Sequence, residues 1–186
     1  MTVIEGIDAE YDAILITAKL MCAAARTAPK TRGIDDIVTK VITGEEIERL
    51  ANFMEKLGKE VPEWSFFIRD ARSIREAKAI VLVGLKSPRV VEVNCGACGL
   101  TCRELRERSC SVEGPAYRGP ICALQLLNLG IAIGSMVKVA SEMNIDNRIM
   151  FSVGVAARKL GLIDADIVVG IPLTCKGKNP FFDRKY

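Results

Sequence analysis

The sequence predicts one α/β domain with a layered α+β core, in which helices flank a mixed β-sheet. Two apolar segments, Ala79–Leu85 and Asp166–Leu173, have the composition of strands that are covered on both faces. Segments with helical periodicity alternate with them, and this alternation is typical of layered α/β proteins. With 186 residues, of which 49% are hydrophobic, the chain suffices for a single domain, 1–186, with a substantial core.

The first helix is predicted over residues 9–28, where apolar side chains recur with a helical period. Pro29 and Gly33 should end it, because neither residue type continues a helix well. Residues 36–42 are rich in β-branched side chains and predict a strand.

A second helix is expected to begin at Thr43 and Glu46, which have the T-x-x-E spacing of a capping box. We expect this helix to continue to Leu57 and to stop at Gly58, a typical C-terminal residue. A shorter helix is predicted over residues 65–77, directly before the first apolar strand.

The most apolar helix is predicted over Cys122–Met143. Its polar residues, among them Gln125 and Asn128, indicate a buried helix rather than a membrane span. The residues that follow predict a turn at 144–147 and a short strand at 148–151. A short helix is predicted at 155–160, with Gly161 as its C-cap, and the tail 176–186 has no periodicity.

The composition excludes several classes of function. The net charge is only +3 with dispersed basic residues, and aromatic residues make up 5%, so a nucleic-acid interface is not expected. The chain contains no histidine, which removes histidine-based catalysis and histidine-ligated metal centres. The acidic residues 1–11 lack an apolar stretch, and the cysteine count of seven is odd. Both observations indicate a cytoplasmic protein with reduced thiols.

The most informative motif is a cysteine loop, Asn-Cys-Gly-Ala-Cys-Gly-Leu-Thr-Cys, at residues 94–102. Cys95, Cys98 and Cys102 follow the spacing C-x2-C-x3-C. Three thiolates in one short loop with one distant thiolate usually hold a [4Fe-4S] cluster. Gly96 and Gly99 would let the backbone curve around the cluster and direct N–H groups toward its sulfides.

The fourth ligand is either Cys110 or Cys122. Cys110 lies in a polar stretch, whereas Cys122 begins the long apolar helix, where the helix dipole favours an anionic thiolate. We therefore predict Cys122 and a cysteine-rich insertion over 94–122. Zinc remains an alternative metal, although structural zinc sites usually use two separate cysteine pairs.

The chain resembles two known families. The cysteine loop is similar to the four-cysteine module of iron–sulfur electron-transfer and corrinoid proteins, with one residue fewer between the second and third cysteines. Segments from about residue 8 onward resemble a ferredoxin-domain family of anaerobic bacteria and archaea. The resemblance is carried by Leu129–Ser135, Asp146–Phe151, Gly170–Leu173 and residues 177–184.

A weaker resemblance connects the chain with the FMN-dependent nitroreductase fold. Ala24–Pro29, the strand after it and the helix at 43–57 follow the order of that fold, which implies a homodimer and an FMN cofactor. Lys30 to Ile34 depart from its usual Ser, Asn and Gln-Pro-Trp residues, and its N-terminal arginine pair is absent. Arg26, Lys30 and Arg32 form either a flavin-phosphate pocket or a cationic end for the first helix.

Gly130 and Gly134 are spaced four apart on the long helix. They permit close packing either inside the domain or, as the nitroreductase-like fold implies, at a homodimer interface. The functional expectation is electron transfer, or a coupled reduction, with a redox protein or small-molecule acceptor as partner and without nucleic acid or membrane. An FMN-dependent oxidoreductase and a zinc-binding or cluster-sensing regulatory protein are the alternatives.

Overall fold

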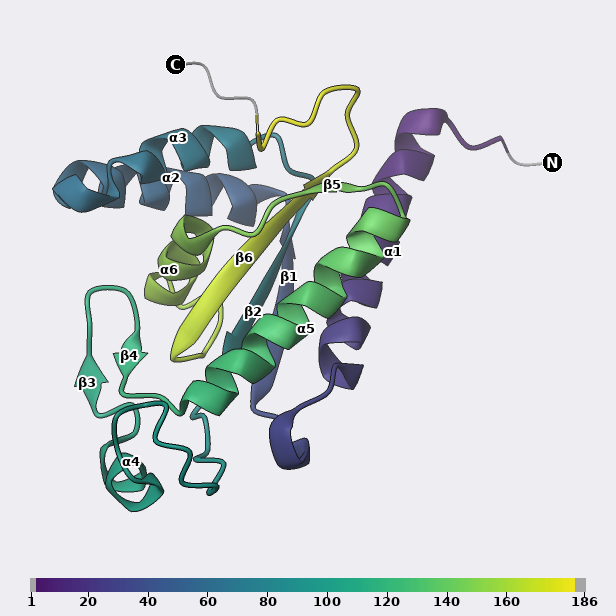
Figure 1. Cartoon of the computed structure of the whole chain (residues 1–186). Coiled ribbons are helices and arrows are strands. Elements are labelled where there is room, and N and C mark those ends of the chain that lie inside the picture. The colour runs from purple at the N-terminus through teal and green to yellow at the C-terminus, as the bar shows by residue number, and fades with distance from the viewer. Residues whose placement is uncertain (1–2, 183–186) are drawn as a thin grey trace.

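The computed structural model describes residues 3–182, which form a sheet between two layers of helices (Figure 1). The four strands of this sheet follow the order β1, β2, β6, β5, and each of the three strand pairs is antiparallel, although we expected a mixed sheet. The strands are β1 (Ile37–Thr43), β2 (Ala79–Leu85), β6 (Ile167–Thr174) and β5 (Asp146–Asn147).

The central strand β2 is buried along its whole length, because helices cover both of its faces. Its odd-numbered residues, such as Val81 and Val83, belong to the apolar cluster formed with α1 (Gly6–Thr27) and α5 (Ala123–Glu142). Ile80 and Leu82 belong to the cluster on the opposite face. That face is covered by α2 (Glu45–Glu60), α3 (Phe66–Ile74) and α6 (Phe151–Lys159).

The capping box predicted at the start of α2 does not form, so this prediction is wrong. Thr43 is the last residue of β1, and Gly44 precedes the helix with a φ of 59° and no side-chain cap. Gly58 does not stop the helix either, since α2 continues to Glu60. A Cβ at Gly58 would lie 2.8 Å from Cγ1 of Ile68, so this glycine permits close contact with α3.

The predicted strand at 148–151 is also wrong. Met150 makes only an isolated bridge to Gly170, and α6 begins at Phe151, four residues earlier than expected. Gly154 lies inside this helix and lets it pack directly on β6, since a Cβ at Gly154 would lie 2.0 Å from the carbonyl oxygen of Val168. Gly161 follows α6 with a φ of 71°, as expected for a helix C-terminus.

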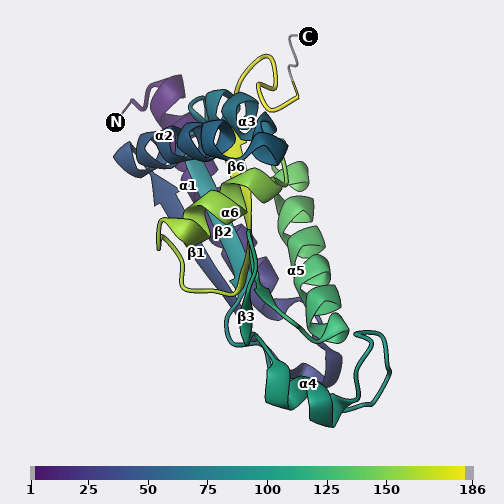
Figure 2. The same cartoon turned by 90° about the vertical axis from the view of Figure 1, so that its left-hand side faces the viewer.

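The segment between β2 and α5 projects from one end of the sandwich (Figure 2). It contains the short helix α4 (Cys102–Arg108) and a hairpin of β3 (Val112–Glu113) and β4 (Arg118–Gly119). Short 3₁₀ turns occur elsewhere at Thr31–Gly33 and Pro62–Trp64. The tail residues 183–186 lie outside the described part of the chain.

Helix α5 is long and apolar enough to cross a membrane, and within residues 3–182 no other helix is. In this structure it packs along α1 and the sheet, and Leu129, Ala132 and Met136 are buried there. Gln125 and Asn128 are fully buried and hydrogen-bonded. One face of α5 therefore belongs to the core, while Leu126, Leu127 and Ile131 are exposed on the rest of its surface.

Replacing Gly154 with Ala should destabilise the fold, because the new methyl group would overlap the backbone of β6. Overpacking of this kind typically costs about 1–3 kcal/mol, and backbone cannot move aside as a side chain can. Urea unfolding measures the effect. Gly6→Ala is the control, since a Cβ at Gly6 meets nothing within 4 Å in the described chain. Equal stability of the two variants would contradict the packing argument.

Candidate metal centre

The cysteine loop uses backbone conformations that favour glycine. Gly96 and Gly99 have φ values of 70° and 78°, and a Cβ at either position would meet nothing within 4 Å in residues 3–182. Glycine is therefore favoured at these two positions by the backbone conformation and not by a lack of space for a side chain. The Gly99 N–H donates to the carbonyl of Gly96 at 2.9 Å and closes the turn between Cys95 and Cys98.

Asn94 connects the two ends of this loop. Its backbone N–H donates to Sγ of Cys102 at 3.2 Å, and its side-chain Oδ1 accepts from the N–H of Cys102 at 2.9 Å. Asn94 has a φ of 50°, a left-handed conformation that asparagine tolerates well. Thr101 caps α4 in a true capping box with Glu104, so the start of the helix holds Cys102 in place.

Cys122 lies immediately before α5, as its N-cap residue, and its side chain is buried. It forms a small apolar cluster with Val91 and Leu105, and Cys98 packs against this cluster. Cys95 is exposed on the loop. Within residues 3–182, no three Cys, Asp or Glu side chains are gathered as a ready metal-ligand set. Cys98 and Cys122 thus contact one cluster, while Cys95 and Cys102 stand apart in the loop.

Cys110 has different surroundings. It is half-buried, has a φ of 53°, and lines a cavity with Ser109 on the other side of residues 87–92. Burial raises the pKa of its thiol, and nearby Asp166 raises it further. A thiol with a raised pKa is a poorer metal ligand, because the thiolate is the ligating form.

A buried chain of hydrogen bonds fixes the start of α5. Asn128 accepts from the backbone and hydroxyl of Thr31 at 2.8 and 3.0 Å, and it donates to Gln125 at 3.0 Å. Gln125 donates to Asp36 at 2.9 Å and to the carbonyl of Arg89 at 3.1 Å. The sequence analysis used Gln125 and Asn128 only as polar residues of α5 and missed this role. Two buried amides three residues apart were the available signal.

The basic residues considered as flavin ligands have partners inside the chain. Lys30 is buried and donates to the carbonyl of Ala25 at 2.6 Å at the end of α1, as a helix-capping cation does. Arg26 pairs with Asp35 and donates to the carbonyl of Ile37. Arg32 donates to the carbonyl of Val91 at 3.1 Å and so supports the segment before the cysteine loop. Their flavin role stays a prediction.

Ion pairs attach the hairpin to the body of the domain. Arg158 is largely buried and donates to both carboxylate oxygens of Glu113, at 2.7 and 2.9 Å. Arg118 donates to the same carboxylate at 2.7 Å. The hydroxyl of Tyr117 donates to the carbonyl of Val168 on β6 at 2.7 Å. The hairpin thus holds the chain between α4 and Cys122 against the sheet.

Comparison with known proteins identifies the family. A protein of Archaeoglobus fulgidus, described as uncharacterized, is 46% identical over 178 residues and covers 95% of each chain. A family model described as "Uncharacterized protein containing a ferredoxin domain" matches residues 118–184, which include Cys122. The chain belongs to this ferredoxin-domain family. The resemblance to this family, which was noted from the sequence, is therefore confirmed.

Solved structures with the same fold are nitroreductases. One from Desulfitobacterium hafniense, with bound FMN, has a TM-score of 0.54 at 12% identity and covers 88% of this chain and 78% of its own. Nitroreductase CinD from Lactococcus lactis, in complex with nicotinic acid, has a TM-score of 0.57 at 10% identity, with 100% and 85% covered. At such identities the likeness shows the fold alone, and it confirms the predicted nitroreductase-like architecture.

The Glu113 ion pairs predict a pH dependence. Hydrogen bonds from Arg158, and next from Arg118, lower the pKa of Glu113 from its usual 4.5 to about 2. Because the folded pKa is depressed, this contribution to stability is complete above the unfolded pKa and is lost as the pH falls through about 2. The difference in unfolding free energy between the wild type and Glu113→Gln should therefore shrink from about pH 5 to pH 2 in urea titrations.

The control for this experiment is Glu63→Gln, which removes an exposed carboxylate from the 3₁₀ turn at Pro62–Trp64. Its stability difference from the wild type should not show the same decline. A Glu113→Gln difference that stays constant across the range would contradict the assignment of these ion pairs.

Proposed function

We propose that this protein is a cytoplasmic iron–sulfur redox protein, in which Cys95, Cys98, Cys102 and Cys122 hold one [4Fe-4S] cluster. The carrying observation is that Cys98, from the loop, packs on the same apolar cluster as Cys122, from the start of α5. Four soft thiol donors from these two segments fit an iron–sulfur cluster chemically. When bound, the cluster would supply one-electron transfer to a redox protein or a small-molecule acceptor.

The chain's own groups suit an anionic cluster. The backbone N–H of Asn94 already donates to the sulfur of Cys102, and such bonds raise the reduction potential of thiolate-ligated clusters. The first N–H groups of α5 follow Cys122 directly, and the positive end of a helix stabilises a thiolate. The half-buried position of Cys98 limits the access of water to that side of the loop.

Protein prepared without oxygen should be brown and should bleach with dithionite. About four iron and four sulfide per chain are expected for a cubane cluster, measured by metal and acid-labile sulfide analysis. One equivalent of zinc without sulfide would instead support the alternative of a zinc-binding structural or regulatory protein. That result would sink the iron–sulfur proposal.

Cys122→Ala should lose or convert the cluster, because it removes the ligand that belongs to the core. Cys110→Ala is the matched control and should keep its iron, since Cys110 lines a separate cavity. Iron content and electron paramagnetic resonance of the reduced protein measure both variants. Loss of iron from Cys110→Ala with retention in Cys122→Ala would reverse the ligand assignment.

An FMN-dependent oxidoreductase is the second candidate, and a specific cavity favours it. A cavity of about 420 Å³ lies between the start of α1 and the end of β6, lined by Tyr11, Lys78 and Lys176. Thr174 is also in its wall, and the buried hydroxyl of Thr174 has no partner within residues 3–182. Lys78 and the unsatisfied hydroxyl are the groups that suit a phosphorylated ligand, since Lys176 pairs with Glu76 and the lining also contains Asp8 and Glu10. Yellow FMN released by denaturing the anaerobic protein would support this candidate.

The α1–α5 layer favours a homodimer. Gly130 and Gly134 are exposed, and a Cβ at either would meet nothing within 4 Å in residues 3–182, so packing inside the domain does not explain them. Leu127 and Ile131 are exposed beside them, at 60% and 46%. An exposed apolar helix face with glycines permits the close approach of a second copy.

Gly134→Leu should weaken this dimer, because a large side chain would separate the two backbones. Overpacking costs about 1–3 kcal/mol, which is roughly a tenfold to hundredfold weaker association. Light scattering over a dilution series measures the change, with Lys56→Leu on α2, in the other layer, as the control for an added leucine. A wild type that has the mass of one chain at micromolar concentration would rule the dimer out.

A further inference from the structure

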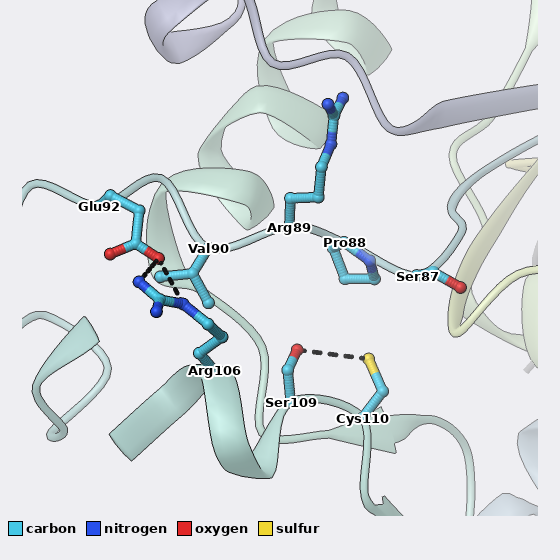
Figure 3. A pocket seen from close by; sticks show the side chains of 8 residues that line it. All are labelled: Ser87, Pro88, Arg89, Val90, Glu92, Arg106, Ser109 and Cys110. Atoms are coloured by element: carbon cyan, nitrogen blue, oxygen red, sulfur yellow. Dashed lines mark hydrogen bonds and ion pairs between the residues drawn. The ribbon is translucent and has the colours of Figure 1, made fainter. Parts of the chain in front are cut away.

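A cavity of about 480 Å³ adjoins the cysteine module on the side away from the loop 94–102. One wall is the segment from Ser87 to Glu92, which leads into the cysteine loop, and Pro88 and Val90 lie in that wall (Figure 3). Ser109 and Cys110 point toward this wall from the end of α4. The volume falls within the range of small-molecule sites, and the proposed cysteine ligands do not line the cavity.

The backbone around this cavity is unusually strained. Six non-glycine residues within 3–182 have positive φ values, and three of them line this cavity. They are Ser87 at 46°, Glu92 at 60° and Cys110 at 53°. Left-handed conformations of such residues are energetically costly, and they concentrate at ligand and active sites. Their concentration here therefore indicates a site rather than a gap between loops.

Val90 connects the cavity with the candidate metal centre. It lines the cavity and also packs against the apolar cluster that contains Cys122 and Cys98. A molecule in the cavity would thus contact a side chain that also packs on the cluster around Cys122. This placement suits a ligand that the cysteine module senses or with which it interacts.

The chemistry of the lining restricts the ligand. Pro88 and Val90 offer an apolar wall. The Ser109 hydroxyl donates its hydrogen to Sγ of Cys110, so the Cys110 thiol, whose pKa is raised by burial, is the donor that remains for a ligand. Arg106 uses Nε and Nη2 on one oxygen of Glu92, at 3.0 and 2.6 Å, and Nη1 is not part of that pair. A guanidinium with a free edge recognises carboxylates.

We propose that this cavity binds a small organic carboxylate with a flat apolar body, held by Arg106 and packed on Pro88 and Val90. The binding site goes beyond the proposed cluster and does not require it. Because Val90 belongs to both the cavity wall and the surroundings of Cys122, we also expect the bound acid to change the spectrum of a cluster, and this second expectation rests on the proposed function.

The site is tested by titrating benzoate into the anaerobic full-length protein in an isothermal titration calorimeter. Benzoate should bind, and benzyl alcohol, which lacks the charge, should bind about tenfold or more weakly. Arg106→Gln should weaken benzoate binding by a similar factor. Arg103→Gln is the matched control, because it removes an equal charge from the exposed face of the same helix, where the side chain is 88% exposed.

Val90→Trp should abolish binding by filling the cavity. If this variant unfolds, Ser109→Trp fills the same space from the opposite wall and should have the same effect. No benzoate binding, equal binding of benzyl alcohol, or binding unchanged in Arg106→Gln or in a folded tryptophan variant would overturn the proposal. If anaerobically prepared protein binds benzoate but contains no iron, the carboxylate site is supported and the cluster is refuted. Failure of the carboxylate site can therefore be distinguished from failure of the proposed cluster.

Discussion

The hydrogen-bond chain through Asn128, Gln125 and Asp36 holds together the parts of the molecule that matter for its function. It joins three segments that are remote in sequence: the turn after α1, the start of β1 and the first turns of α5. Gln125 and Asn128 are fully buried, so each unmade bond would cost about 1–3 kcal/mol. The amides are satisfied only when these segments take this one arrangement.

The position of the cysteine module follows from that chain. Gln125 stands three residues after Cys122, and it also binds the carbonyl of Arg89, at the entrance to the cysteine loop. Arg89 in turn donates its backbone N–H to Asp36 at 2.8 Å. Both ends of the insertion are therefore anchored to one half-buried carboxylate, Asp36, and one buried amide, Gln125. The insertion can carry strained backbone because its two ends are fixed by the core.

The two ends of the sandwich carry different chemistry. One end holds the cysteine loop, Cys122, the strained cavity of Cys110 and the hairpin attached through Arg158. The other end holds the cavity with Thr174 and Lys78. Helix α5 has 20 residues and spans the distance between these ends, about 30 Å at 1.5 Å per residue. A cluster at one end and a flavin at the other would thus be separate sites within one chain. In a dimer, a site of one subunit would have sites of the second subunit as additional neighbours.

The local errors of the sequence analysis share one cause. The T-x-x-E pattern occurs at Thr43 and again at Thr101, and only the second forms a capping box. At Thr43 the chain is still paired with Ala79 in β1, and Gly44 takes the N-cap position instead, so α2 begins at Glu45. Gly58 was similarly ambiguous. Glycine ends a helix or permits close packing, and only the neighbouring element decides between these roles.

The sequence by itself determined the layered architecture, the burial of β2 and β6, the family and the cysteine loop. These features are local in origin: apolar periodicity selects helix or strand, and glycines at 96 and 99 allow the left-handed turns that the loop adopts. Tertiary structure alone decided that Gln125 links the start of α5 to Asp36 and to the carbonyl of Arg89, and that Cys110 lines a cavity with residues 87–92. The two bonds of Gln125 join residues 89 and 36 positions apart, and only the packed core brings such distant groups within hydrogen-bonding distance.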